Sequence, residues 1–123
     1  MNIVIIDNNL GLLRSLQLLL DREGHHVIPF SAPSEGLFYF VREKDIDVLL
    51  IDYSMPEMNG DEFVTLLKKE IPTKCRIVMM SAHNPNPIEM KRLGIQTFLE
   101  KPIDLEQLKS SLMKQPEPEG VQL

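Results

Sequence analysis

The strongest constraint on the fold of this chain is a series of five short apolar runs. They are separated by longer stretches whose apolar residues recur at helical spacing. The runs are continuously apolar rather than alternating, which is typical of strands that are buried on both faces of a parallel sheet. They cover residues 3–6, 27–30, 48–51, 77–80 and 97–99.

The stretches between these runs predict helices. Gly24 ends the first, Pro33 fits the first turn of the second, and Asp104 can cap the last, which runs to about Met113. The alternation of strand and helix predicts an α/β fold of the flavodoxin-like (βα)5 kind. In that fold right-handed crossovers give a doubly wound, parallel, five-stranded sheet in the order 2-1-3-4-5. We expect one domain over residues 1–115, followed by a flexible tail or linker start over residues 116–123.

Length and composition narrow the functional classes. The 123 residues suit one domain and leave no room for a separate effector domain. Because Cys75 is the single cysteine, an internal disulfide or a cysteine-based zinc cluster is excluded, and a cytoplasmic setting is expected. The net charge of −5 argues against direct nucleic-acid binding. No apolar stretch is long enough for a membrane span.

Polar residues stand where the predicted strands end. Asp7 and Asn8 follow the first strand, Asp52 the third, Ser81 the fourth and Lys101 the fifth. These four strands are neighbours in the proposed order, and ligands bind at the carboxyl ends of the strands in such sheets. We therefore expect the side chains to converge on one crevice.

The residue types in this crevice predict phosphoryl chemistry. Two carboxylates, with carbonyl and water oxygens, suit Mg²⁺. A carboxylate can also attack phosphorus and form an aspartyl phosphate. A lysine and a hydroxyl can hold phosphoryl oxygens and offset their charge. The predicted reaction is phosphoryl transfer onto Asp52.

Four segments carry a resemblance to the receiver domain of two-component response regulators, of the chemotaxis-regulator-like kind. The most specific is the Asp-x-x-Met-Pro-x-Met-x-Gly pattern that starts at Asp52, and the Lys-Pro pair at Lys101 comes at the matching distance. The other two segments are residues 5–9 and 80–82. The resemblance covers residues 1 to about 115.

The resemblance implies a role for each position. Asp52 would be the phosphoacceptor, and Asp7, Asp52 and the backbone carbonyl of Ser54 would bind Mg²⁺. Lys101 would bind a phosphoryl oxygen, or pair with Asp52 in the unmodified protein. The Lys101–Pro102 peptide bond would be cis. Ser81 and Phe98 would form the switch.

The resemblance also implies partners. A sensor histidine kinase or a phosphotransfer protein would donate the phosphoryl group. The surface of the fourth helix, fifth strand and fifth helix would contact an output domain, another partner or a second copy in a homodimer. The domain would promote its own phosphorylation and dephosphorylation but turn over no external substrate.

Two departures from the family pattern carry expectations of their own. Asn8 stands where the family usually has a second acidic residue, and an uncharged oxygen there predicts weaker Mg²⁺ binding, directly or through water. The stretch from Ser81 to Lys101 is about two residues shorter than usual. It contains Pro85 and Pro87, which predict a short fourth helix starting near Pro87.

A purely structural role remains an alternative for each of these residues. Asp7 could cap a helix, Lys101 could be a solvated charge, Ser81 a loop hydroxyl and Phe98 a core aromatic. For the whole chain, Asn8 favours an unphosphorylated interaction module of receiver type. A phosphatase with an aspartate nucleophile is a further alternative, although the Asp-x-Asp sequence common after the first strand of such enzymes is missing here.

Overall fold

The protein forms a single parallel sheet, as the computed structural model shows for residues 1–95 and 97–113. The strand order is β2-β1-β3-β4-β5, which confirms the predicted flavodoxin-like topology. All four strand pairs are parallel. The strands are β1 (Asn2–Ile6), β2 (His26–Phe30), β3 (Val48–Asp52), β4 (Arg76–Ser81) and β5 (Thr97–Glu100).

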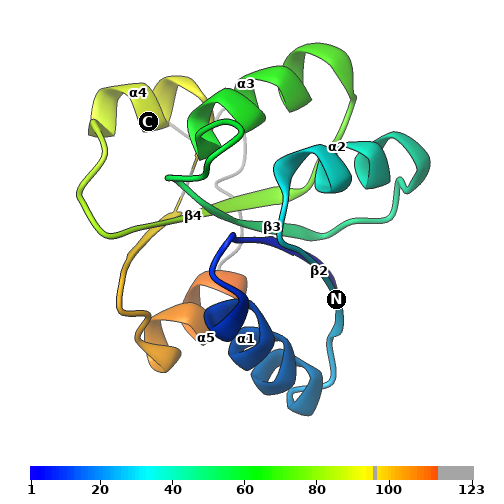
Figure 1. The fold of residues 1–123 in the computed structure, drawn as a ribbon, viewed down its shortest axis with the longest axis vertical. Coiled ribbons are helices and arrows are strands. Elements are labelled where there is room, and N and C mark those ends of the chain that lie inside the picture. Colours follow the sequence, from blue (N-terminus) through cyan, green and yellow to red (C-terminus); the bar gives the residue numbers. More distant parts are fainter. Residues whose placement is uncertain (96, 114–123) are drawn as a thin grey trace, which may run out of the picture.

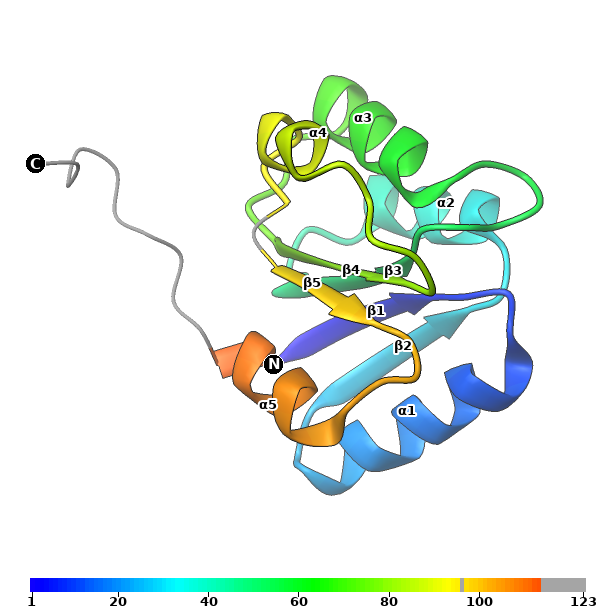
Figure 2. The ribbon, with the colours of Figure 1, turned by 90° about the vertical axis from the view of Figure 1, so that its left-hand side faces the viewer.

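Five helices cover the two faces of the sheet. In Figures 1 and 2, α1 and α5 lie on one face, and α2, α3 and α4 lie on the other. This three-layer arrangement explains why the strands are continuously apolar. The helices are α1 (Leu10–Arg22), α2 (Pro33–Arg42), α3 (Gly60–Glu70), α4 (Pro87–Arg92) and α5 (Leu105–Met113).

Successive residues of each strand enter two different cores. In β1, Ile3 and Ile5 belong to the cluster beneath α1 and α5, whereas Val4 and Ile6 belong to the cluster beneath α2, α3 and α4. All four side chains are fully buried. Packing on both faces fixes the register of the strands, because a slip of one residue would exchange the two sets. The ends of the strands are thereby held in place.

The start and end of α1 follow from local signals. Asn9 caps the helix, since its side-chain oxygen accepts a hydrogen bond from the Leu12 N–H at 3.1 Å. Gly24 follows the last turn with a φ of 90°, a conformation that side chains disfavour. Because Asn9 is the N-cap, Asp7 does not cap this helix, and the purely structural role considered for Asp7 is excluded.

Helix α4 begins at Pro87 and is six residues long, as the two prolines predict. The side-chain oxygen of Asn86 accepts hydrogen bonds from the N–H groups of Ile88 and Glu89 at 2.9 and 3.3 Å. Proline at the first helical position loses no hydrogen bond, because that N–H would lack a helical partner. The late start is thus set jointly by Asn86 and Pro87.

Gly60 lets α3 begin directly against the strand that carries Asp52. A Cβ on Gly60 would lie 2.6 Å from the Asp52 carbonyl oxygen and 2.8 Å from the Met79 sulfur. The Gly60 N–H donates a hydrogen bond of 2.6 Å to the Tyr53 carbonyl. Helix and strand approach so closely that only glycine fits.

Gly60→Ala is therefore expected to lower the free energy of unfolding by about 1–3 kcal/mol, the usual cost of overpacking. Urea denaturation followed by circular dichroism measures it. Gly11→Ala is the matched control, since a Cβ there would meet only the Asn9 side-chain oxygen, at 3.4 Å. Equal stability of the two variants would contradict the proposed close contact.

The sequence also carried expectations about membrane-spanning segments and about the C-terminal tail. In the part that the structure describes, no helix has the length and apolar character needed to cross a membrane. The predicted tail at residues 116–123 lies outside the described residues, and so does the domain boundary at 115.

Candidate functional site

The predicted polar residues meet at one edge of the sheet. Asp7 follows β1, Asp52 ends β3, Ser81 ends β4 and Lys101 follows β5. Backbone hydrogen bonds continue past the strand ends, from the Tyr53 N–H to the Met80 carbonyl and from the Lys101 N–H to the Ser81 carbonyl, both at 2.7 Å. This continuation places the side chains on adjoining strands.

Lys101 joins the two carboxylates. Its Nζ lies 2.9 Å from Oδ2 of Asp7 and 3.1 Å from Oδ1 of Asp52. Asp7 is fully buried and Asp52 is 4% exposed, so both charges are largely removed from water. Lys101 is not a solvated charge. It also contacts a second acid, Asp7, which the sequence did not assign to it.

Backbone N–H groups complete the partners of the acids. The Asn9 N–H donates to Oδ1 of Asp7 at 2.8 Å, and Ser54 gives Asp52 a backbone hydrogen bond. Neither donor was expected from the sequence, because both depend on loop backbone rather than on side-chain type. The Asn9 contact had a signal, since an Asp is prone to accept from the N–H two residues later.

The surroundings of Asp52 shift the pKa of its carboxyl group. Burial, followed by the nearby charge of Asp7, raises the pKa of Asp52, although the hydrogen bonds from Lys101 and Ser54 oppose the rise. Burial alone would lower the pKa of Lys101. Its interactions with Asp7 and then Asp52 outweigh that effect and raise it. The lysine therefore stays charged at neutral pH.

A raised pKa for Asp52 makes stability depend on pH. Stability that is present below the unfolded-state pKa, about 3.9, is lost as the pH rises through the higher folded-state pKa. Asp52→Asn removes the buried charge and is therefore expected to raise the free energy of unfolding at pH 7. Urea titrations between pH 4 and 7 measure the difference, which should shrink toward pH 4. A gap that grows on acidification would contradict the raised pKa.

The two predicted switch residues lie beside this cluster. Ser81 is 4% exposed, and its Oγ accepts a hydrogen bond from the His83 N–H at 3.1 Å. Phe98 on β5 is half-buried and packs against the core beneath α2, α3 and α4. The Lys101–Pro102 peptide bond is cis, as expected. These positions agree with a switch and equally with a loop hydroxyl and a core aromatic.

The site offers the carboxylate oxygens that Mg²⁺ requires, but only two acidic side chains supply them. Its charges are two carboxylates and one ammonium, which leave a net charge of −1. Asn8 is exposed and adds no charge. Across the described residues, no group of three or more His, Cys, Asp or Glu side chains could hold a metal. The set fits a Mg²⁺ ion bound through one or two carboxylates with several waters.

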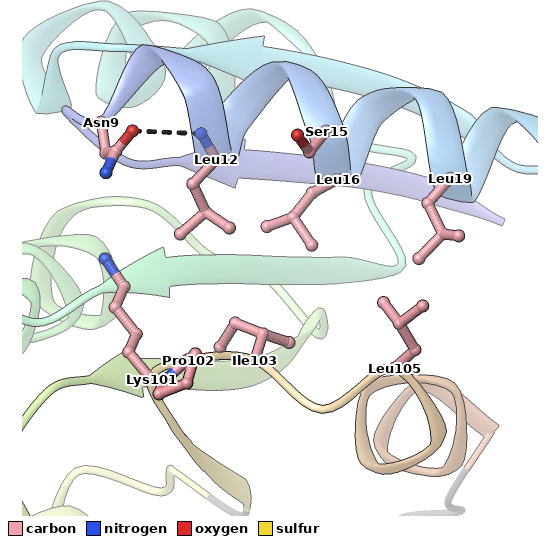
Figure 3. A pocket seen from close by; sticks show the side chains of 9 residues that line it. All are labelled: Asn9, Leu12, Ser15, Leu16, Leu19, Lys101, Pro102, Ile103 and Leu105. Atoms are coloured by element: carbon pink, nitrogen blue, oxygen red, sulfur yellow. Dashed lines mark hydrogen bonds between the residues drawn. The ribbon is translucent and has the colours of Figure 1, made fainter.

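An apolar groove of about 750 Å³ opens beside Lys101. Figure 3 shows leucine side chains of α1 facing residues of the segment after β5, with the Lys101 ammonium at one end. The groove thus adds apolar surface next to the charged cluster. Its apolar walls are Leu12, Leu16, Leu19, Pro102, Ile103 and Leu105.

Comparison with known proteins gives a consistent match. The family model described as the response regulator receiver domain matches residues 3–113. The chain is 31% identical over 109 residues to the transcriptional regulatory protein GlrR of Escherichia coli, covering 87% of this chain but 24% of that protein. It is 30% identical over 109 residues to the protein PilH of Pseudomonas aeruginosa, covering 86% and 89%.

A solved structure supports the same match at the level of the fold. The crystal structure of a response regulator receiver domain protein from Clostridium thermocellum superposes with a TM-score of 0.82 and 27% sequence identity. The alignment covers 90% of each chain. The match therefore extends over the sheet and its helices.

Proposed function

The chain belongs to the response regulator receiver domains, and from this we propose that it accepts a phosphoryl group on Asp52. Receiver domains are the phosphoaccepting modules of two-component signalling. The observation that carries the assignment to Asp52 is its contact with Lys101, 3.1 Å away at the edge of the sheet, beside the second buried carboxylate of Asp7.

Asp52 would act as the nucleophile. A carboxylate oxygen attacks phosphorus, an O–P bond forms, and the bond from phosphorus to the donor's leaving group breaks. The Ser54 backbone hydrogen bond favours the ionised form of Asp52, which the attack requires. Lys101 would bind an oxygen of the transferred group and offset its charge. The same groups would later orient water for loss of the phosphoryl group.

Asp7 and Asp52, with the Ser54 carbonyl, are the residues proposed to hold Mg²⁺. The ion, when bound, would neutralise charge on the phosphoryl oxygens. Asn8 would contribute at most an uncharged oxygen, so we expect binding weaker than in sites with three acids. Asp7 already has its orientation fixed by the Asn9 N–H at 2.8 Å.

Ser81 and Phe98 would transmit phosphorylation of Asp52 to the surface of the domain. A phosphoryl group on Asp52 offers the Ser81 hydroxyl a stronger, charged acceptor. Reaching it would break the present hydrogen bond to the His83 N–H. Phe98 is half-buried and could follow, which would bias the surface of α4, β5 and α5 between two states. An output domain, a partner or a second copy would read this surface.

A histidine kinase or a phosphotransfer protein is the proposed donor. The donor must bring its phosphoryl group to Asp52. The apolar groove between α1 and the segment after β5 is lined by Lys101, whose Nζ lies 3.1 Å from Oδ1 of Asp52. This chain spans about a quarter of the length of GlrR.

Intact mass spectrometry after incubation with Mg²⁺ and acetyl phosphate tests the phosphoacceptor. We expect a phosphate adduct on the natural protein, none on Asp52→Asn, and an undiminished adduct on the control Asp45→Asn, an exposed site. An adduct that persists in Asp52→Asn would overturn the assignment. No adduct with this donor or a cognate kinase would favour the unphosphorylated interaction module, which Asn8 supports, and sustained phosphomonoester turnover would favour the phosphatase.

A further inference from the structure

Aromatic side chains surround an exposed pocket beside α2. The pocket has a volume of about 370 Å³, and its aromatic walls are Phe30, Phe38 and Tyr39. The ring centroids of Phe30 and Tyr39 lie 5.4 Å apart, whereas Phe38 is 63% exposed. Figure 1 shows α2 at the end of the layer that it forms with α3 and α4. None of these three aromatic residues belongs to the proposed phosphoacceptor site, so the pocket is a separate surface feature.

Two opposite charges flank this pocket. Glu35 lies in the first turn of α2 and Arg42 in the last, and both line the pocket. They are seven positions apart, about two helical turns, so they lie on the same side of the helix with Phe38 between them. Within the part of the chain that the structure describes, neither charge forms a salt bridge. Both charges therefore remain available to a partner.

The order of these charges along α2 is self-complementary. In a two-fold symmetric pair of antiparallel helices, with the axis midway between positions 35 and 42, Glu35 of each copy faces Arg42 of the other. The same axis passes between positions 38 and 39, so Phe38 of each copy faces Tyr39 of the other. A parallel pair would instead bring each charge against its like charge, at a cost in free energy. The surface therefore matches a second copy of this chain in one orientation.

We propose that the face of α2 formed by Glu35, Phe38, Tyr39 and Arg42 binds a second copy of the chain in this antiparallel arrangement. The inference goes beyond the proposed function and does not depend on it. Phe38 of each copy enters the aromatic pocket of the other and leaves water, which supplies the main driving force. The two Glu35–Arg42 contacts set the orientation more than the affinity.

The size of this face predicts a weak dimer. Helix α2 has 10 residues and is therefore about 15 Å long. A contact of that length buries less area than the interface of a stable complex, and we expect a dissociation constant on the order of 100 μM. Because the flanking contacts are ion pairs at the surface, the dimer should weaken as the ionic strength rises.

Sedimentation equilibrium at protein concentrations from about 10 μM to about 1 mM, a range that brackets this constant, tests the proposal. We expect the natural protein to dimerise over this range. Glu35→Arg and Arg42→Glu should each raise the dissociation constant about tenfold, because two like-charge contacts replace two attractive ones. The matched control is Glu106→Arg, which reverses an exposed acid in the first turn of α5 and should leave the constant unchanged. Circular dichroism checks that each variant folds.

An equimolar mixture of Glu35→Arg and Arg42→Glu gives the sharpest outcome. In a mixed dimer each contact joins one basic and one acidic side chain, so the mixture should associate about tenfold more tightly than either variant alone. A natural protein that stays monomeric at about 1 mM would overturn the proposal. So would a mixture that associates no more tightly than its components, or an equal loss of association in Glu106→Arg.

If a charge-reversed variant does not fold, nuclear magnetic resonance of the natural protein decides instead. The backbone amide signals of residues 34–42 should shift as the protein concentration rises, and signals that stay unchanged up to about 1 mM would refute the contact. Asp52→Asn should dimerise as the natural protein does, because Asp52 does not line the pocket. Failure of the phosphoacceptor assignment would therefore leave this result unaffected.

Discussion

Asp7→Asn is expected to slow Mg²⁺-dependent phosphorylation of Asp52 by roughly 100-fold, comparable to the loss of one electrostatic stabiliser in an active site. The reason is the sparse acid count. Asn8 adds no charge, so this variant would leave Asp52 as the one carboxylate at the site, and Lys101 would pair with it alone. The rate is measured by intact mass at timed intervals after addition of acetyl phosphate at fixed Mg²⁺.

Two controls separate this loss from misfolding. Asp21→Asn changes an exposed acid on α1 and should keep the natural rate. The thermal midpoint of Asp7→Asn without Mg²⁺ should not fall much, because the substitution removes one of two repelling buried charges. A rate for Asp7→Asn within threefold of the natural protein would count against a role for Asp7 in binding the metal.

Phe63→Ala is expected to lower the free energy of unfolding by about 3–5 kcal/mol, a large part of the stability of a small domain. Phe63 on α3 is fully buried and meets Phe40 of α2 edge to face, with ring centroids 6.2 Å apart. Its removal leaves a cavity between two helices and the sheet. Urea denaturation at pH 7 measures the loss.

The matched substitution is Phe38→Ala on the outer side of α2. Phe38 is 63% exposed, and the Arg42 guanidinium lies 5.2 Å from its ring centroid. Its loss should cost about 0.5–1 kcal/mol. If the two variants were equally stable, Phe63 would not be a core residue of the folded protein in solution.

The fold could be predicted because its signals are local and agree with one another. Val4 and Ile5 point to opposite faces of the sheet and are both fully buried, so the lack of alternation in β1 indicated a covered parallel sheet. Pro87 indicated the late start of α4, because proline fits the first position of a helix. Strand order was expected from the flavodoxin-like topology that this alternation of strands and helices favours.

The site could be predicted only in outline. Strand order brings Asp7, Asp52 and Lys101 to one edge, and this much follows from the topology. Lys101 contacts both acids, with its Nζ 2.9 Å from Asp7 and 3.1 Å from Asp52, and no sequence pattern predicts these two distances. The same holds for Gly60, whose need for close contact depends on the Asp52 carbonyl oxygen lying beneath α3.

Reduction of the phosphorylated protein with borohydride tests the central claim most directly. An aspartyl phosphate is an acyl phosphate, so hydride converts that aspartate to homoserine, and peptide mass spectrometry locates the change. We predict homoserine at Asp52 and at no other carboxylate, dependent on prior incubation with Mg²⁺ and acetyl phosphate. Homoserine at Asp7 or another acid instead of Asp52, or a phosphate found only on a histidine or serine, would contradict the account.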